Sequence, residues 1–274
     1  MFGVGLRHQH FPYLLKALET GPQEIAVDWF EGITENFFET EGRPLQVLEK
    51  IRRDFPVSLH GVSLSIASSE DLDLEYLKKV KTLYKRIDPL IVSDHLCWTG
   101  HKNRNLHNLL PIAYNEESLK WLVPRIQKVQ DFIGRPLALE NLSAYFDLHT
   151  STMTEWDFLA ALSKTSGCKL LLDINNVFVN SVNHKFDPQV YVDAIPDSAI
   201  AEIHLAGYSD MGTHLFDTHS CQVWPGVWDL YRHKMRNGLH VPVLVEWDEE
   251  IPDFPVLRAE ATKARTLTEE MRRG

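Results

Sequence analysis

Cysteine is scarce in this sequence, and long apolar runs are absent. The 274-residue chain has three cysteines, Cys97, Cys168 and Cys221, and no CxxC pair. We therefore expect neither a disulfide framework nor a thiolate metal site, and a reducing cytoplasm suits the chain. No stretch approaches the ~18 apolar residues that span a membrane. The N-terminus, MFGVGLRHQHF, lacks a basic segment followed by an apolar one, so no signal peptide is expected.

Positive charge is also in short supply. Lysine and arginine number 28 against 38 aspartates and glutamates, which gives a formal net charge of −10, and no basic run occurs. Such a surface repels phosphate backbones, so nucleic-acid binding is not expected. The surplus of carboxylates has a second interpretation, because carboxylates that hold metal cations enter this count while the cations do not.

Eight short apolar runs alternate with amphipathic segments along the chain. This alternation is typical of a parallel sheet covered by helices, and eight units at a length near ~250 residues indicate a closed (β/α)8 TIM barrel. We therefore predict an α/β fold with a single domain, residues 1–274; the alternative is an open, doubly wound sheet. The predicted strands are Gly3–Leu6, Ile25–Ile33, Val57–His60, Leu90–Ser93, Leu137–Glu140, Leu170–Ile174, Ile200–Leu205 and Val243–Trp247.

Helices are predicted between these strands where apolar residues recur at helical spacing. The segment Leu96–Pro111, after the fourth strand, is interpreted as an insertion, and His184 is placed in a loop after the sixth strand. The predicted helices are Phe11–Glu19, Leu45–Arg53, Leu74–Arg86, Glu116–Ile133, Glu155–Lys164, Val227–Arg236 and Leu257–Arg272.

Polar residues stand at the carboxyl end of nearly every predicted strand. In a TIM barrel these ends share one face, where active sites lie, and polar groups buried there cost stability unless they are paired or coordinated. The loop after the seventh strand adds Asp217 and His219, two residues apart, which can point the same way in an extended segment. The strand-end residues are Glu35, Asn36, His60, Asp94, His95, Glu140, Asn141, Asp173, Asn175, Asn176, His204, Glu246 and Asp248.

This set of side chains suits a metal centre. Histidines, carboxylates and amides without cysteine favour iron, manganese or zinc and argue against copper(I) or an iron–sulfur cluster. The candidates exceed what one tetrahedral zinc ion needs, so bridging carboxylates would let them serve two or three metals roughly 3.5–4 Å apart. Each residue alone has an ordinary structural interpretation, and Asp173 and Asn175 also fit a turn after a strand. The prediction rests on their joint position.

Seven strings, in order along the chain, carry a resemblance to a known family. They are SLHGVSLSI, VSDHLCW, LALENLS, LLLDINNVFVN, EIHLAG, FDTH and VLVEWD. With them the chain resembles the multinuclear non-haem iron-dependent oxidative enzymes, which modify ribosomally synthesised peptides (RiPPs) and include the oxidase of methanobactin biosynthesis. The resemblance covers nearly the whole chain and implies an oxidoreductase with a xylose-isomerase-like TIM barrel.

The same resemblance implies two or three iron ions, as Fe2+ and Fe3+, with O2 as co-substrate. Glu140 matches a carboxylate that bridges metals, and Asp248 and Glu35 are candidates for handling protons or supporting the ligands. The matched metal ligands are His60 and His95 of the early strands, Asp173, His204 and Glu246 around a central iron, and Asn175, Asp217 and His219 around a further iron.

The partners follow from the resemblance as well. A precursor peptide is the expected substrate, and a separate peptide-recognition protein is the expected partner. The resemblance also implies a cysteine as the modified residue, and a nearby metal cation would favour loss of its thiol proton.

Two other functions stay open at this point. Divalent-metal (Zn/Mn) TIM-barrel hydrolases and isomerases of the apurinic-endonuclease and sugar-isomerase type use similar side chains, with zinc activating water. A binding or scaffold protein that keeps an unused metal site is the other, because fold does not fix function.

Overall fold

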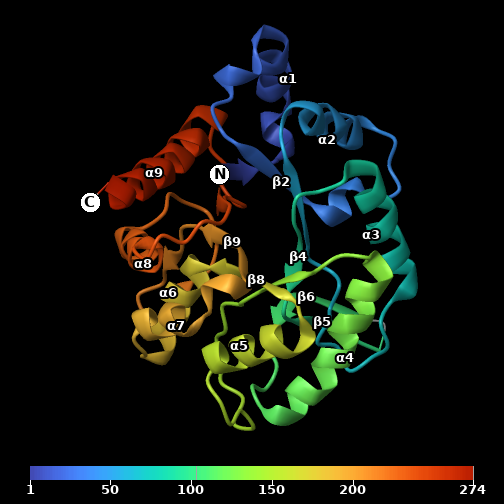
Figure 1. The fold of residues 1–274 in the computed structure, drawn as a ribbon, viewed down its shortest axis with the longest axis vertical. Coiled ribbons are helices and arrows are strands. Elements are labelled where there is room, and N and C mark those ends of the chain that lie inside the picture. The colour runs from blue at the N-terminus through green and yellow to red at the C-terminus, as the bar shows by residue number, and fades with distance from the viewer. Residues whose placement is uncertain (103, 274) are drawn as a thin grey trace.

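A closed barrel of eight parallel strands forms the centre of the computed structural model, which describes residues 1–102 and 104–273 (Figure 1). Its order is β1-β12-β9-β8-β7-β4-β3-β2, and β1 closes the barrel by pairing with both β12 and β2. The barrel prediction is confirmed, and the open sheet is wrong. The barrel strands are β1 (Phe2–Gly5), β2 (Trp29–Ile33), β3 (Val57–Gly61), β4 (Val92–His95), β7 (Ala138–Glu140), β8 (Lys169–Asp173), β9 (Ile200–Leu205) and β12 (Val243–Val245).

Helices surround the barrel from α1 to α9 (Figure 1). Each has an apolar face; in α2, for example, Leu45, Leu48 and Ile51 are buried at helical spacing while the two arginines of the last turn face outward. All seven predicted helices are present with closely similar bounds. They are α1 (Phe11–Thr20), α2 (Arg43–Asp54), α3 (Leu74–Ile87), α4 (Glu116–Ile133), α5 (Glu155–Ser166), α8 (Pro225–Met235) and α9 (Phe254–Arg273).

Two further helices, α6 (Ile174–His184) and α7 (Pro188–Ala194), lie where a loop was expected. The α6 sequence, INNVFVNSVNH, is rich in asparagine and β-branched residues, which are poor helix formers. Tertiary packing overrides that preference, because most of the helix is buried. The Asp173 side chain caps it by accepting a hydrogen bond from the Asn176 backbone N–H at 2.6 Å. His184 therefore ends a helix, and Asn175 lies in its first turn.

Small hairpins follow two of the barrel strands. The insertion after β4 forms β5 (Trp98–His101) and β6 (Arg104–Leu110), and the loop after β9 forms β10 (Ser209–Asp210) and β11 (Leu215–Phe216). Short 3-10 turns are η1 (His8–His10), η2 (Pro22–Glu24), η3 (Thr34–Phe37) and η4 (Asp197–Ala199). Because β4 and β9 are parallel, both hairpins lie at the face of the barrel where the strands end.

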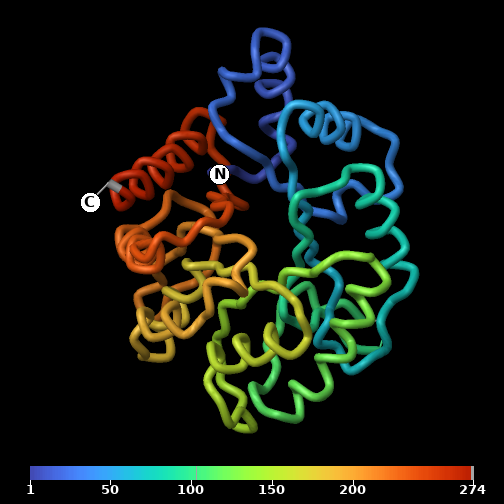
Figure 2. The backbone as a smooth tube through the Cα atoms, in the orientation of Figure 1, coloured from blue at the N-terminus to red at the C-terminus, as the bar shows by residue number. Residues whose placement is uncertain are grey.

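The first and last parts of the described chain are neighbours in the fold (Figure 2). Helix α9 packs against β1 and β12. Its Arg265 guanidinium bonds the Asp28 carboxylate at 2.8 Å and lies over the Phe2 ring, 5.2 Å from the ring centroid. Among the described residues, no helix has the length and apolar character needed to cross a membrane.

Candidate metal centre

A pocket of about 280 Å³ opens where the barrel strands end. The predicted ligands His60, His95, Glu140, His219 and Glu246 line it. The two hairpins that follow β4 and β9 also line it, through Asn108 and Leu109 of β6 and Phe216 of β11. Other lining residues are Ile33, Val62, Leu142, Ser143, Tyr145, Asn176, Asp217, Thr218 and Asp248.

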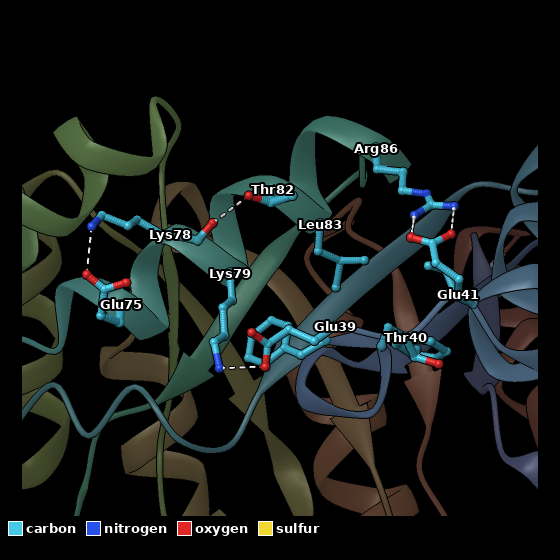
Figure 3. Close-up of a pocket in the computed structure, with 12 residues that line it drawn as sticks. Glu39, Thr40, Glu41, Glu75, Lys78, Lys79, Thr82, Leu83 and Arg86 are labelled. Carbon is cyan, nitrogen blue, oxygen red and sulfur yellow. Dashed lines mark hydrogen bonds and ion pairs between the residues drawn. The ribbon is translucent and has the colours of Figure 1, made fainter.

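A second hollow, of about 310 Å³, lies on the outside of the barrel between α2 and α3 (Figure 3). Its charged side chains pair with one another: Lys79 bonds Glu39 at 2.7 Å, and Arg86 bonds both oxygens of Glu41 at 2.7 and 2.9 Å. No histidine is among the described residues that line it. Because these charges are already paired, the pocket at the strand ends is the better candidate for chemistry.

The first ligand group of the pocket consists of His60, His95 and Glu140. The Nε2 atoms of the two histidines lie 3.2 and 3.3 Å from Glu140 Oε2, and 3.4 Å from each other. All three side chains are buried. Two ligands of one ion, each bound at about 2.0–2.2 Å, lie roughly 2.8–3.6 Å apart in tetrahedral or octahedral geometry. The observed spacing therefore matches three ligands of one metal ion.

The protonation of this group supports the same fit. The His95 Nδ1 lies 3.1 Å from the Gly61 carbonyl oxygen, which only accepts, so Nδ1 carries the proton and Nε2 presents a lone pair. Burial, together with His60, holds the pKa of His95 well below its ordinary value. Glu140 Oε2 is buried and has no hydrogen-bond partner in the described part of the chain. Burial raises the pKa of Glu140 well above its ordinary value, so either a proton on Glu140 or a cation between the three side chains would relieve the repulsion of these lone pairs.

The second ligand group consists of Glu140, Asp173, His204 and Glu246. All four are buried, and one donor atom from each lies within 4.8 Å of the others. Burial raises the pKa of Asp173 to about 7, and Asp173 Oδ2 has no hydrogen-bond partner among described residues. Burial also acts to raise the pKa of Glu246, but His204 and His219 outweigh it and hold that pKa well below the ordinary value. Glu140 belongs to both groups and lies between them.

The third predicted set, Asn175, Asp217 and His219, lies at the edge of the second group. Asn175 Nδ2 donates to Asp217 Oδ1 at 2.7 Å, and the same oxygen lies 2.7 Å from His219 Nε2. His219 Nε2 is also 3.9 Å from Asp173 Oδ2. Asn175 Oδ1 is buried and without a hydrogen-bond partner among described residues. The structure thus brings these three side chains together, although Asp217 faces its two neighbours rather than the first group.

Asp248 lines the pocket next to His219, whose Nδ1 lies 3.4 Å from Asp248 Oδ2. Its other oxygen bonds the buried guanidinium of Arg7, which also reaches Glu246 Oε1 at 3.4 Å and the Trp247 carbonyl oxygen at 3.4 Å. Arg7 follows β1 and was not among the predicted site residues. It places a permanent positive charge beside the two carboxylates of the segment that follows β12.

Glu35, the other candidate for handling protons, is not brought to this pocket. Its Oε1 accepts hydrogen bonds from the Val62 backbone N–H at 2.9 Å and the Tyr76 hydroxyl at 2.7 Å, behind β3. There it faces Asp94, and burial together with Glu35 raises the pKa of Asp94 well above its ordinary value. Glu35 and Asp94 therefore support the ends of β3 and β4 rather than the pocket.

Two buried glutamates inside the barrel, Glu31 of β2 and Glu202 of β9, were not predicted as site residues. The Oε1 atoms of both lie 3.2 Å from His204 Nε2, on the side of the ring away from Glu246. Burial lowers the pKa of His204, but Glu31 and Glu246 outweigh it and hold that pKa well above the ordinary value. The signal was a charged residue within an apolar strand run, which a survey of strand ends passes over.

An aromatic pair forms part of the pocket rim. The rings of Tyr145 and Phe216 stack with centroids 5.0 Å apart, and the two residues are 43% and 42% exposed. The Asp217 backbone N–H donates to the Tyr145 hydroxyl at 2.9 Å, and Ser143 Oγ donates to Asp217 Oδ2 at 2.9 Å. Both rings also line an adjoining groove of about 920 Å³ that reaches Val182 of α6 and the β10–β11 hairpin.

Sequence comparison gives one family and many relatives. The family model described as RiPP precursor modification enzyme MbnB/TglH/ChrH matches residues 1–269. A UPF0276 protein of Acaryochloris marina is 46% identical over 264 residues, which cover 96% of this chain and 93% of that protein. A UPF0276 protein of an Anaeromyxobacter species is 48% identical over 262 residues, covering 96% and 90%.

Solved structures with a similar backbone are barrel proteins of low sequence identity. An L-ribulose 3-epimerase aligns with a TM-score of 0.66 at 13% identity, over 99% of this chain and 95% of that one. A xylose isomerase domain protein from Alicyclobacillus acidocaldarius aligns with a TM-score of 0.60 at 15% identity, over 98% of each chain. At these identities the likeness concerns the fold alone, and it confirms the xylose-isomerase-like TIM barrel.

Proposed function

The chain belongs to the MbnB/TglH/ChrH family of RiPP precursor modification enzymes, and from this premise we propose that it is a multinuclear non-haem iron oxidase. It uses O2 to modify a residue of a ribosomally synthesised precursor peptide, and we propose cysteine as that residue. The family supplies the enzyme class and the peptide substrate; the metal, the oxidant and the modified residue are the proposal.

One observation carries the metal part of the proposal. Glu140 is shared by two groups of buried ligands, and oxygens of Glu140, Asp173 and Asn175 have no hydrogen-bond partner among described residues. Burying polar atoms without partners costs roughly 1–3 kcal/mol each. Metal ions at this position would remove that cost, and a carboxylate shared by two groups is what a pair of bridged metal ions requires.

The ligand roles follow from the three sets of side chains. One ion would be held by His60 and His95 with Glu140, and a second by Glu140, Asp173, His204 and Glu246. Asn175, Asp217 and His219 would hold a third. Iron bound there would supply one-electron chemistry with O2 and would favour the deprotonated form of a substrate thiol.

Side chains of the pocket would handle the protons and the peptide. Asp248 reaches the pocket, and its carboxylate is held by Arg7, so Asp248 Oδ2 is placed to accept a proton from the substrate. The stacked rings of Tyr145 and Phe216 lie between the pocket and the adjoining groove. Exposed apolar side chains gather there, since Phe146 and Val182 also line the groove. A groove of this kind suits an extended peptide that delivers one side chain to the pocket.

The proposal includes a partner and a location. A separate peptide-recognition protein would bind the remainder of the precursor peptide, since the pocket itself holds little more than one side chain. All three cysteines are unpaired, which agrees with our placement of the enzyme in the cytoplasm.

The test is the metal content and oxidation state of the full chain, purified without added metal and without air. Two or three iron ions per chain, with the spectroscopic signal of a mixed-valent pair, support the proposal. Zinc or manganese that stays bound after expression in iron-rich medium would instead favour the hydrolase or isomerase alternative. A chain that binds no metal would overturn the proposal.

A further inference from the structure

We propose that Glu31 and Glu202 are positioning residues that fix the His204 ring so that its Nδ1 faces the second ligand group. Neither residue touches the pocket. The inference rests on the proposed function only for the ligand role of His204. The clamp itself, meaning Glu31, Glu202 and the His204 Nε2–H between them, is a feature of the barrel interior that can be tested without metal.

The barrel topology explains how the clamp forms. Glu202 and His204 are two residues apart on β9, so their side chains emerge on the same face of the strand. Glu31 lies on β2, which is separated from β9 in the barrel by β1 and β12. It therefore reaches His204 across the barrel interior rather than along a strand pair. The contact ties two non-neighbouring strands to one imidazole.

The three side chains of the clamp are buried and lie close together. Glu31 and Glu202 are 2% and 0% exposed, and His204 is 0% exposed. Both Oε1 atoms lie 3.2 Å from His204 Nε2. Ser58 Oγ donates a hydrogen bond to the other oxygen of Glu31 at 2.9 Å, which fixes that carboxylate in turn. Glu202 Oε2 has no hydrogen-bond partner among described residues. We therefore expect Glu31 to hold the His204 ring more firmly than Glu202 does.

The consequence for His204 is a fixed choice of nitrogen. The Glu31 carboxylate accepts from Ser58 through one oxygen and faces Nε2 with the other, so Nε2 carries a proton and is not free to bind a metal ion. Nδ1, 3.0 Å from Glu246 Oε2, is the nitrogen left for the second group. A metal-bound histidine whose other N–H donates to a carboxylate is a stronger ligand, and loss of the carboxylate typically weakens metal binding 10–100-fold.

The experiment uses the metal-free full chain and Co2+ as the probe, because Co2+ binding is followed by visible absorption. Glu31→Gln should weaken the binding of one Co2+ ion about 10–100-fold, and Glu202→Gln should weaken it less. Ser58→Ala removes the hydrogen bond to Glu31 but leaves the Glu31 carboxylate in place. It should weaken Co2+ binding less than Glu31→Gln does, and it replaces Glu31→Gln in the test if that variant does not fold. The matched control is Glu155→Gln, a carboxyl of α5 that accepts a hydrogen bond from the Tyr114 hydroxyl and does not line the pocket. It should keep wild-type affinity.

A second measurement separates this inference from the proposed function. In the metal-free chain labelled with 15N-histidine, His204 should show a slowly exchanging Nε2–H proton that is lost in Glu31→Gln and kept in Glu155→Gln. If that proton is present but the wild type binds no Co2+, the clamp stands and the proposed metal centre fails. Unchanged Co2+ affinity in Glu31→Gln, an equal loss in Glu155→Gln, or a Co2+ ion bound at Nε2 would overturn the inference.

Discussion

At the scale of single residues, Glu140 is the side chain on which the proposed bridged metal centre depends. Its Oε2 lies within 3.3 Å of both His60 and His95, and its carboxylate also belongs to the second group. Glu140→Gln keeps the shape but removes the charge and one acceptor oxygen. We therefore expect this variant to bind at most one metal ion, measured by elemental analysis of chain purified without air.

The control for that variant is the loss of a carboxylate that does not line the pocket, as in Glu155→Gln. It should retain the wild-type metal content. Full metal content in Glu140→Gln would show that this residue does not bridge, and the assignment of two ions to two groups would have to be abandoned.

Glu155 gives a second prediction at this scale, away from the pocket. Burial raises its pKa from an ordinary value of 4.5 to about 7, although the hydrogen bond from the Tyr114 hydroxyl acts in the opposite direction. Because the folded state holds this proton more tightly, ionisation of Glu155 costs no stability below about pH 4.5. The cost grows as the pH rises through 7 and is complete above it. The full shift corresponds to roughly 3 kcal/mol.

Glu155→Gln removes that cost, because the amide stays neutral at every pH. Urea unfolding of the metal-free chain should show the variant gaining roughly 2–3 kcal/mol over wild type between pH 5 and pH 8. Glu117→Gln, at an exposed position in α4, is the control for removing a surface charge. An equal pH dependence in wild type and Glu155→Gln would contradict the buried, raised pKa.

The sequence located the histidines and carboxylates that line the pocket but not the residues that support them. The strand-end rule finds His60, His95 and Glu140 because parallel strands deliver their last side chains to one face. It passes over Glu31 and Glu202, which lie within strands, although the two-residue spacing of Glu202 and His204 was a usable signal. It also passes over Arg7, whose partners lie 239 and 241 residues away. Contacts across the barrel join residues that are far apart in the sequence, so no local sequence pattern marks them.

At the scale of elements, the loop from β9 to α8 carries Asp217 and His219 and depends on Gly207. A Cβ atom at that position would meet the carbonyl oxygens of Cys221 and Gln222 at 2.4 and 2.5 Å. Gly207→Ala must therefore push the returning loop outward. Crowding of this kind costs roughly 1–3 kcal/mol, and we expect weaker binding of one metal ion together with a lower melting temperature.

The measurement is a Co2+ titration and a thermal unfolding scan on the same sample. Gly42→Ala is the matched substitution, because the nearest atom to its added Cβ is a flexible side-chain oxygen of Thr40 at 3.1 Å. If Gly207→Ala binds Co2+ and unfolds as wild type does, the close approach of the loop is not what positions Asp217 and His219.

The elements themselves were largely predictable, and the exceptions have physical causes. Helices cover the outside of the barrel, so its eight strands are mostly apolar. These apolar runs can be recognised in the sequence. Helix α6 was missed because its packing, not its propensity, makes it helical. The hairpin inside the expected insertion, β5–β6, has an exposed and irregular β6 strand, so no alternation of apolar and polar residues marked it.

At the scale of the whole molecule, the fold alone does not choose between the candidate functions. The structures that align with it include epimerases at 13% identity, and one barrel supports many reactions. Family membership favours peptide modification, and the surplus of negative charge disfavours the nucleic-acid version of the alternative. The proposed metal ions would also add to the stability of the fold, because their ligand groups join several strands.

Metal removal should destabilise the entire barrel, because the proposed ligands come from β3, β4, β7, β8, β9 and β12 and the loops after them. Without cations, several buried carboxylates face one another at the strand ends. A ligand at 100 times its Kd adds roughly 2.7 kcal/mol for each site, which is a rise of several degrees in melting temperature for a chain of this size. We therefore expect Co2+ to raise the melting temperature of the metal-free chain, with a smaller rise in Glu140→Gln. The rise should be reversed by a chelator. Equal melting temperatures with and without Co2+ at saturating concentration would mean that the strand ends are held together by protons and hydrogen bonds alone.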